Sequence, residues 1–274
     1  MNVHQLTLTF CFFAFVVCTQ VCGDDKEAIE KVVFDAQRAG VERGDLQAYL
    51  AQWTKDARII AGRGPIKGEF EITLDRQQIE DTRRLRFSWR PVEYGNWKLG
   101  FRDVQTTITG DHAQMKLKST VTVAYSRETV GEIYKLRRTK DGWRVYENRF
   151  WPIETKQAIN RITKYDAATW KQLDADVDRF KNEDKPLQVL GALQAAYRWK
   201  EAHKQAKTVF SSPKISAREW LSRAGTALQA GDADDAIYSF KMAKKIEPQL
   251  EIPSAVKWHP QLCLALNARG RDLR

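Results

Sequence analysis

The sequence predicts an α+β protein in two parts, in which helices precede a long antiparallel sheet and an all-α tail follows. Apolar residues recur at helical spacing up to about residue 85. Long alternating runs come next, with hairpin signals at Gly110-Asp111 and Asp141-Gly142. Strand patterns then stop near residue 154. Helices followed by a run of strands favour α+β over a doubly wound parallel sheet.

The start of the chain predicts a signal peptide over residues 1–23. This stretch contains no Lys, Arg, Asp or Glu, and its apolar run LTLTFCFFAFVVC has the length of a signal-peptide core. We expect cleavage near Gly23, export to the periplasm or the extracellular space, and no membrane span in the mature chain. The weakly positive start leaves a retained N-terminal anchor as the alternative.

The cysteine count and the net charge limit which cross-links, metal sites and binding partners the protein can have. Three of the 4 cysteines lie in the first 23 residues, so the mature chain keeps Cys263 alone and is expected to have no internal disulfide and no cysteine metal site. The net charge of +10 is compatible with nucleic acid, an acidic polymer or an anionic membrane surface. Because the cations are spread along the chain, a solvated basic surface is the simpler interpretation, and we expect no nucleic-acid partner.

The first part contains three predicted helices and at least five predicted strands. The helices are expected over 26–44, over 46–56 with Asp45 as its N-cap, and over 71–85. A short strand over 57–65 runs into a Gly/Pro turn. The later strands are expected over 85–94, 98–109, 113–126, 129–139 and 142–151.

Residues 26–152 resemble the SnoaL-like group of the nuclear transport factor 2-like superfamily. The resemblance rests on Trp53 followed by Asp56-Ala57, on Gly68 before the third helix, and on the hairpin residues 141–143, Asp-Gly-Trp. It implies a curved sheet wrapped around the first helix, as a cone whose pocket takes small apolar molecules or peptides. We place this domain at 24–153. The superfamily includes enzymes and binding proteins, so the resemblance implies a fold and no single activity.

The catalytic patterns of that superfamily are incomplete in this sequence. Its isomerases use an Asp base just after the Asp-Ala step, where this chain has residues 59–62, Ile-Ile-Ala-Gly. Its cyclases and dehydratases use Asp and His, but His112, His203 and His259 lie outside the predicted pocket strands. No His, Asp or Glu cluster has metal-ligand spacing, so no metal or cofactor is expected.

The last hairpin supplies the candidate pocket. A two-residue turn at Asp141-Gly142 would place Glu147 opposite Leu136 and Arg149 opposite Tyr134, all on one face of the sheet. Glu147 is the best candidate for a base and Arg149 for an anion anchor, and the alternative is a salt bridge of little energetic value. The expected pocket residues are Trp53, Glu132, Tyr134, Glu147, Arg149 and Trp151.

The tail, residues 154–274, resembles the tetratricopeptide (TPR) family over 216–249. Positions 4, 8, 15, 20, 24, 27 and 32 of a 34-residue unit are Trp220, Ala224, Gly231, Ala236, Phe240, Ala243 and Pro248. The resemblance implies a partner-binding surface, to which we assign Trp220, Arg223 and Ala227, although large apolar residues are expected at the last two positions. An earlier copy over 183–213 is weaker, and an ordinary helical hairpin is its alternative. Residues 259–270 are expected to cap the stack.

A second unusual segment, 86–102, alternates aromatic residues with arginine and lysine. Such a segment can stack sugars or bases. The alternative, which we favour, is an aromatic-rich strand that packs on the helices.

The sequence therefore favours an exported, non-catalytic protein with a cone-fold pocket for a small apolar or acidic ligand and a TPR-like tail for a protein or peptide. The first alternative is a SnoaL-like isomerase or lyase that acts on a small organic molecule with Glu147 as its base. The second alternative is a dimerisation or scaffold module that forms a homodimer through the sheet.

Overall fold

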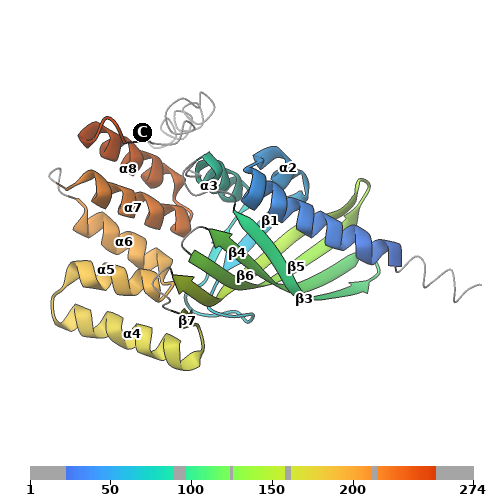
Figure 1. Ribbon diagram of the computed structural model, residues 1–274, viewed down its shortest axis with the longest axis horizontal. Coiled ribbons are helices and arrows are strands. Elements are labelled where there is room, and N and C mark those ends of the chain that lie inside the picture. The colour runs from blue at the N-terminus through green and yellow to red at the C-terminus, as the bar shows by residue number, and fades with distance from the viewer. Residues whose placement is uncertain (1–22, 89–96, 124–125, 158–161, 212–214, 251–274) are drawn as a thin grey trace, which may run out of the picture.

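A seven-stranded sheet and a stack of helices make up the protein (Figure 1). The computed structural model describes residues 23–88, 97–123, 126–157, 162–211 and 215–250. Outside these residues lie positions 1–22 of the predicted signal peptide, Cys263, His259 and the predicted cap over 259–270. Within them, no helix is long and apolar enough to cross a membrane.

The N-terminal helices follow the prediction until residue 51. A helix over 23–38 continues into a π-helical turn, Ala39–Arg43, and ends at Gly44 with φ of 65°. The Asp45 side chain then accepts a hydrogen bond from the Ala48 amide and starts α2, Leu46–Ala51. The predicted helix over 46–56 is wrong beyond residue 51, because β1, Trp53–Ala61, pairs in parallel with the last long strand.

The third helix is shifted toward the C-terminus relative to its prediction. Residues Ile72–Leu74 form the short strand β2, and α3 spans Arg76–Ser88. Asp75 and Gln78 exchange side-chain and backbone hydrogen bonds at the start of this helix, which fixes where it begins. The predicted strand over 85–94 is therefore wrong over 85–88, and its remaining residues lie outside the described ones.

Four long strands form most of the sheet. They are β3, Lys98–Thr109; β4, His112–Val123; β5, Ser126–Thr139; and β6, Gly142–Gln157. The order is β2-β1-β6-β5-β4-β3, and β7, Ile162–Lys164, pairs with β6. These neighbours are antiparallel except β1 and β6. The α+β class and the curved sheet packed on helices are confirmed.

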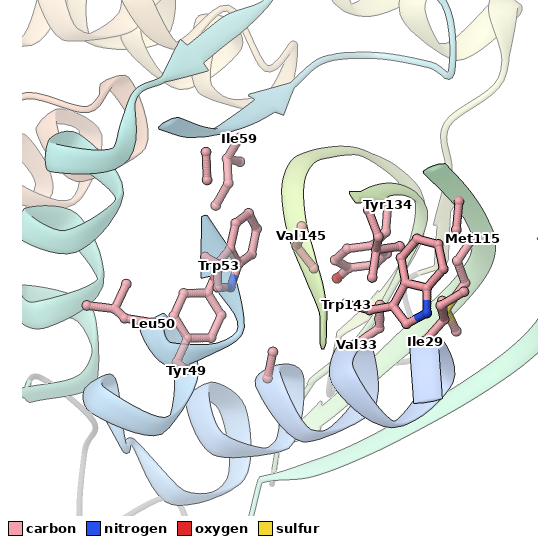
Figure 2. Packing of buried hydrophobic residues seen from close by; sticks show 14 of the residues in the cluster. Ile29, Val33, Tyr49, Leu50, Trp53, Ile59, Met115, Tyr134, Trp143 and Val145 are labelled. Atoms are coloured by element: carbon pink, nitrogen blue, oxygen red, sulfur yellow. The ribbon is translucent and has the colours of Figure 1, made fainter. Parts of the chain in front are cut away.

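The long first helix lies across one face of the sheet, here called the inner face, and forms the main core with it. Figure 2 shows Ile29 and Val33 directed at Met115, Tyr134 and Trp143 of the sheet, and all five are buried. Burial of one such aliphatic side chain is worth about 1.5–3 kcal/mol. The helical spacing of the apolar residues in the sequence therefore corresponds to the face that the helix presents to the sheet.

Within the described residues, five helices follow the sheet and stack in chain order, each against the next (Figure 1). They are α4, Ala167–Asn182; α5, Pro186–Ala195; α6, Trp199–Val209; α7, Ala217–Ala230; and α8, Ala233–Ile246. Ser216 and Glu219 form a capping box at the start of α7, and Gly231, with φ of 82°, ends it. The two helices of the predicted repeat thus coincide with α7 and α8.

The helical stack is docked on the first part of the chain. Leu85 of α3 is fully buried in a cluster with residues of α7 and α8, including Leu228 and Phe240. Arg63, in the connection between β1 and β2, donates two hydrogen bonds to Asp174 of α4, at 2.6 and 2.7 Å. An apolar contact and a bidentate ion pair therefore join the two parts.

Candidate functional site

The register of the β5–β6 hairpin decides which residues share the inner face. Thr139 pairs with Gly142 and Leu136 with Val145, whereas Lys135 pairs with Glu147. Tyr146 is therefore an extra residue, a β-bulge. A shift by one residue moves every later side chain of the strand to the other face. The predicted register is wrong for this reason, and Asn148, in place of Arg149, lies opposite Tyr134.

The predicted base and anion anchor consequently lie away from Glu132 and Tyr134. Glu147 accepts a hydrogen bond from Arg58 and lies 2.8 Å from the Lys135 Nζ. Burial would raise the pKa of Glu147, but hydrogen bonds from Lys135 and Arg58 lower it below its usual value. Arg149 forms an ion pair with Glu71. The outer face thus holds these two residues in ion pairs, and the inner face holds the other candidates.

Glu132 is the centre of a buried polar cluster on the inner face. Its carboxylate accepts hydrogen bonds from the hydroxyls of Ser119 and Tyr134 and from Asn148 Nδ2, the last at 3.2 Å. The Tyr134 hydroxyl in turn accepts a hydrogen bond from Gln37 of the first helix. The cluster links the first helix to three neighbouring strands, so it fixes their relative positions as well as holding a carboxylate.

The environment of Glu132 favours its protonated form. Burial raises its pKa, and the hydrogen bonds from Ser119, Tyr134 and Asn148 oppose this effect only in part. Burial and the neighbouring Glu132 charge raise the pKa of Tyr134 well above its ordinary value. The pair therefore places a carboxyl group with a raised pKa beside a phenol with a raised pKa, and the phenol donates its hydrogen bond to that carboxyl group.

Aromatic and cationic groups lie on the helical side of this cluster. Trp53 packs against Tyr49 with ring centroids 5.4 Å apart, and the Arg83 guanidinium lies 5.6 Å from the Tyr49 ring centroid. The Trp53 Nε1 is buried without a hydrogen-bond partner among the described residues. Of the six predicted pocket residues, Trp53, Glu132 and Tyr134 are thus buried in the domain core, whereas Glu147, Arg149 and Trp151 belong to the outer face.

Sequence reasoning missed Ser119, Asn148, Gln37 and Arg83. The sequence could have identified Gln37, because this polar residue follows the buried Val33 by four positions on the apolar side of the first helix. It could not have identified Asn148, because the orientation of that side chain depends on the bulge at Tyr146.

The predicted partner-binding residues of the tail are buried between helices. Trp220, Arg223 and Ala227 are only 2%, 9% and 0% exposed. The Arg223 Nε donates to Asp235 of α8 at 3.0 Å, and His203 of α6 lies 3.0 Å from the same carboxylate. A large apolar residue was expected at position 223. Arg223 can be buried there because the Asp235 carboxylate neutralises its charge.

Neither His112 nor a metal-ligand cluster forms a catalytic site among the described residues. His112 lies at the β3–β4 turn, where its ring meets Tyr146 edge-on at 6.3 Å between centroids. Among the described residues, no group of three or more His, Cys, Asp or Glu side chains could hold a metal ion.

Comparisons with known proteins give a fold resemblance. No protein-family model matches the chain, and no curated protein matches it. Among solved structures, a candidate dehydratase of the nuclear transport factor 2-like family from Streptomyces avermitilis is 19% identical, with a TM-score of 0.38, over 48% of this chain and 97% of that one. A protein of unknown function from Shewanella baltica, described as nuclear transport factor 2-like, is 15% identical, with a TM-score of 0.35, over 47% and 94%.

A third structure of this kind, from Novosphingobium aromaticivorans, is described as having a cystatin-like fold. It is 18% identical, with a TM-score of 0.37, over 50% of this chain and 87% of that one. At these identities and scores, the similarities do not assign a function to the chain.

Proposed function

We propose that the protein is an exported, non-catalytic binding protein. In this proposal its cone-shaped domain supports a TPR-type helical stack, and the stack binds a segment of another protein. The observation that carries the proposal is a 34-residue spacing between matching residues of α5 and α7, the two helices that we assign to equivalent places of successive repeat units.

Equivalent residues of α5 and α7 form the proposed binding surface. Leu187 and Gly191 lie on α5, and Leu221 and Gly225 follow them by 34 residues on α7, where Leu221 is half-buried against the core of the helical stack. Leu187 is 54% exposed, and a Cβ placed on either glycine would meet no atom within 4 Å. Glycine in a helix costs about 1 kcal/mol relative to alanine, and packing within the chain requires neither glycine. A partner segment that approaches the two helices closely would explain both.

The two helices are held together as one surface. Gln194 of α5 donates a hydrogen bond to the Thr226 hydroxyl of α7 at 2.7 Å. Leu85 of α3 anchors the far end of α7 to the sheet domain. A surface on fixed elements loses little entropy on binding, which suits recognition of an extended peptide.

The test is selection from a random peptide library on the purified full chain. We expect enriched peptides whose affinity falls at least tenfold, equivalent to about 1.4 kcal/mol, when Gly191→Arg and Gly225→Arg fill the surface. Ala175→Arg, on the exposed side of α4, is the matched control and should leave binding unchanged. If the double variant Gly191→Arg with Gly225→Arg enriched the same peptides as the wild type, the proposal would be contradicted.

The Glu132 cluster supports a second candidate, in which the inner face of the sheet binds a small organic molecule and the chain is an enzyme of the SnoaL-like kind. In this case Glu132 replaces Glu147 as the acid–base group, because Glu132 has a raised pKa and Tyr134 as a hydrogen-bonded neighbour.

A thermal-shift screen of small carbonyl and phenolic compounds distinguishes this candidate. A true ligand should raise the Tm of the wild type and lose most of that effect in Glu132→Gln, which keeps the shape of the side chain. A compound that stabilises both proteins equally binds elsewhere, and a screen without a Glu132-dependent compound would count against the candidate.

A further inference from the structure

The outer face of the sheet carries an excess of positive charge. Six cationic side chains project from this face on four adjacent strands: Arg58, Lys116, Lys118, Lys135, Arg137 and Arg144. Three carboxylates pair with these cations: Glu147 with Arg58 and Lys135, Asp56 with Arg137, and Asp103 with Lys118. Arg149 also lies on this face, and Glu71 balances its charge. Six cations thus stand against three carboxylates, which leaves a net positive charge on this face.

The cations are both accessible and fixed in place. The side chains of Arg58, Lys118, Lys135 and Arg137 are 55%, 42%, 40% and 39% exposed, and Lys116 is also exposed. Because they stand on paired strands, their spacing is set by the sheet, at about 4.8 Å between strands and about 6.8 Å along a strand. The pattern is an ordered array of positive charge on a rigid surface.

An aromatic surface accompanies this charge. A Cβ on Gly131 would lie 2.4 Å from the Cε2 and Cζ2 of Trp151, so the indole packs directly against the strand at a glycine. Trp151 remains partly exposed, and the Tyr146 ring lies 5.8 Å from the Arg137 guanidinium. Aromatic rings held against a sheet provide apolar surfaces on which a ring-shaped ligand can stack.

We propose that this outer sheet face binds an acidic polysaccharide. The cations are placed to contact carboxylate or sulfate groups, while Trp151 and Tyr146 contact the sugar rings. The face bears like charges, which disfavours pairing with a second copy of itself. Strands β4, β5 and β6, which carry most of these cations, each pair with a neighbouring strand on both sides and so have no free edge. The proposed recognition therefore uses side chains and not β-strand addition.

The experiment measures binding of the full chain to polygalacturonate and heparin, with neutral dextran, poly-glutamate and duplex DNA of matched charge for comparison. We expect an acidic polysaccharide to bind at least tenfold more tightly than poly-glutamate and DNA, dextran not to bind, and the affinity to fall as salt rises. Binding to heparin alone or to polygalacturonate alone would identify the acidic group.

Two variants connect the binding to this face. Lys116→Glu with Arg144→Glu should reduce affinity for the polysaccharide about tenfold. Lys200→Glu with Lys204→Glu, on the exposed side of α6, changes the net charge equally and should have little effect. Trp151→Ala should weaken polysaccharide binding and leave binding of poly-glutamate unchanged.

Three results would each overturn the proposal. They are poly-glutamate or DNA binding as tightly as the polysaccharide, equal losses in the two charge-reversal variants, and no polysaccharide binding at low salt. Circular dichroism of every variant establishes that the losses do not come from unfolding.

Discussion

Two buried carboxylates, Glu132 in the sheet and Asp235 in the helical stack, respond to burial in opposite ways. They are 4% and 9% exposed, respectively. Burial raises the pKa of Glu132, which neutral donors surround. Burial would likewise raise the pKa of Asp235, but hydrogen bonds from His203 and Arg223 and the Arg223 charge hold that pKa well below its usual value.

The comparison shows that partners, and not burial alone, determine the charge of an interior acid. In the helical stack, the cost of burying an ion is offset by a cation in direct contact. In the sheet, neutral groups donate hydrogen bonds to the Glu132 carboxyl group and offset the effect of burial only in part, so its pKa stays raised. Four predictions test this difference, from the largest expected effect to the smallest.

Removal of the cation in the helical stack should have the largest effect. Arg223→Leu leaves the buried Asp235 with His203 as its remaining close partner and should lower the free energy of unfolding by about 3–5 kcal/mol. Urea denaturation measures it. The double variant Arg223→Leu with Asp235→Ala should recover part of this loss, and no recovery would show that Arg223 acts through packing alone.

Truncation of the carboxyl group in the sheet should cost less. Glu132→Ala leaves Ser119, Tyr134 and Asn148 without their acceptor and should lower the free energy of unfolding by about 2–4 kcal/mol. Glu132→Gln keeps an acceptor oxygen and should cost clearly less at neutral pH. Equal losses in both variants would mean that Glu132 is charged and that its charge is needed.

The pH dependence should differ in sign between the two acids. The contribution of Asp235 is present above its unfolded-state pKa of about 3.9 and is lost as the pH falls through its lower folded-state pKa. The contribution of Glu132 is complete below its unfolded-state pKa of about 4.3 and is lost as the pH rises through its higher folded-state pKa. Glu132→Gln should therefore gain stability relative to the wild type as the pH rises, and Asp235→Asn should lose its disadvantage in acid. Urea titrations at several pH values measure both trends.

The outer ion pairs should contribute least. Glu147→Gln removes the carboxylate that pairs with Arg58 and Lys135, both of which are largely accessible to water, and should cost about 0–1 kcal/mol. Chemical denaturation in low and high salt measures this cost. A loss as large as that of Glu132→Ala would show that the two faces of the sheet are energetically alike.

Local chemistry predicted much of the fold. The spacing of Ile29 and Val33 identified the helix face that packs on the sheet, and Gly110-Asp111 identified the β3–β4 turn, because Thr109 does pair with His112. The end of α2 was harder to locate, since Trp53 continues the helical pattern but pairs with Val145 of β6. Long-range pairing overrode local preference there.

The candidate site depended on one residue that no local rule marked. Alternation along β6 gave Glu147 and Arg149 the same orientation as Val145, and the bulge at Tyr146 reversed both. Arg223 is a similar case, since its burial makes sense only once Asp235 is opposite it. The sequence analysis singled out both Glu147 and Arg223 as candidates. It did not identify their partners, which are Arg58 and Lys135 for Glu147 and Asp235 for Arg223.

The sequence by itself thus determined the α+β class, the positions of the long strands and the helical tail, because hydrophobic period and turn chemistry are local properties. The tertiary structure alone decided which carboxyl group lies in the interior, which acid meets a cation, and which side of the sheet gathers the positive charge. These outcomes depend on strand register and on contacts between residues far apart in the sequence, such as Arg58 with Glu147, 89 positions apart, and Gln37 with Tyr134, 97 positions apart. No local pattern in the chain encodes them.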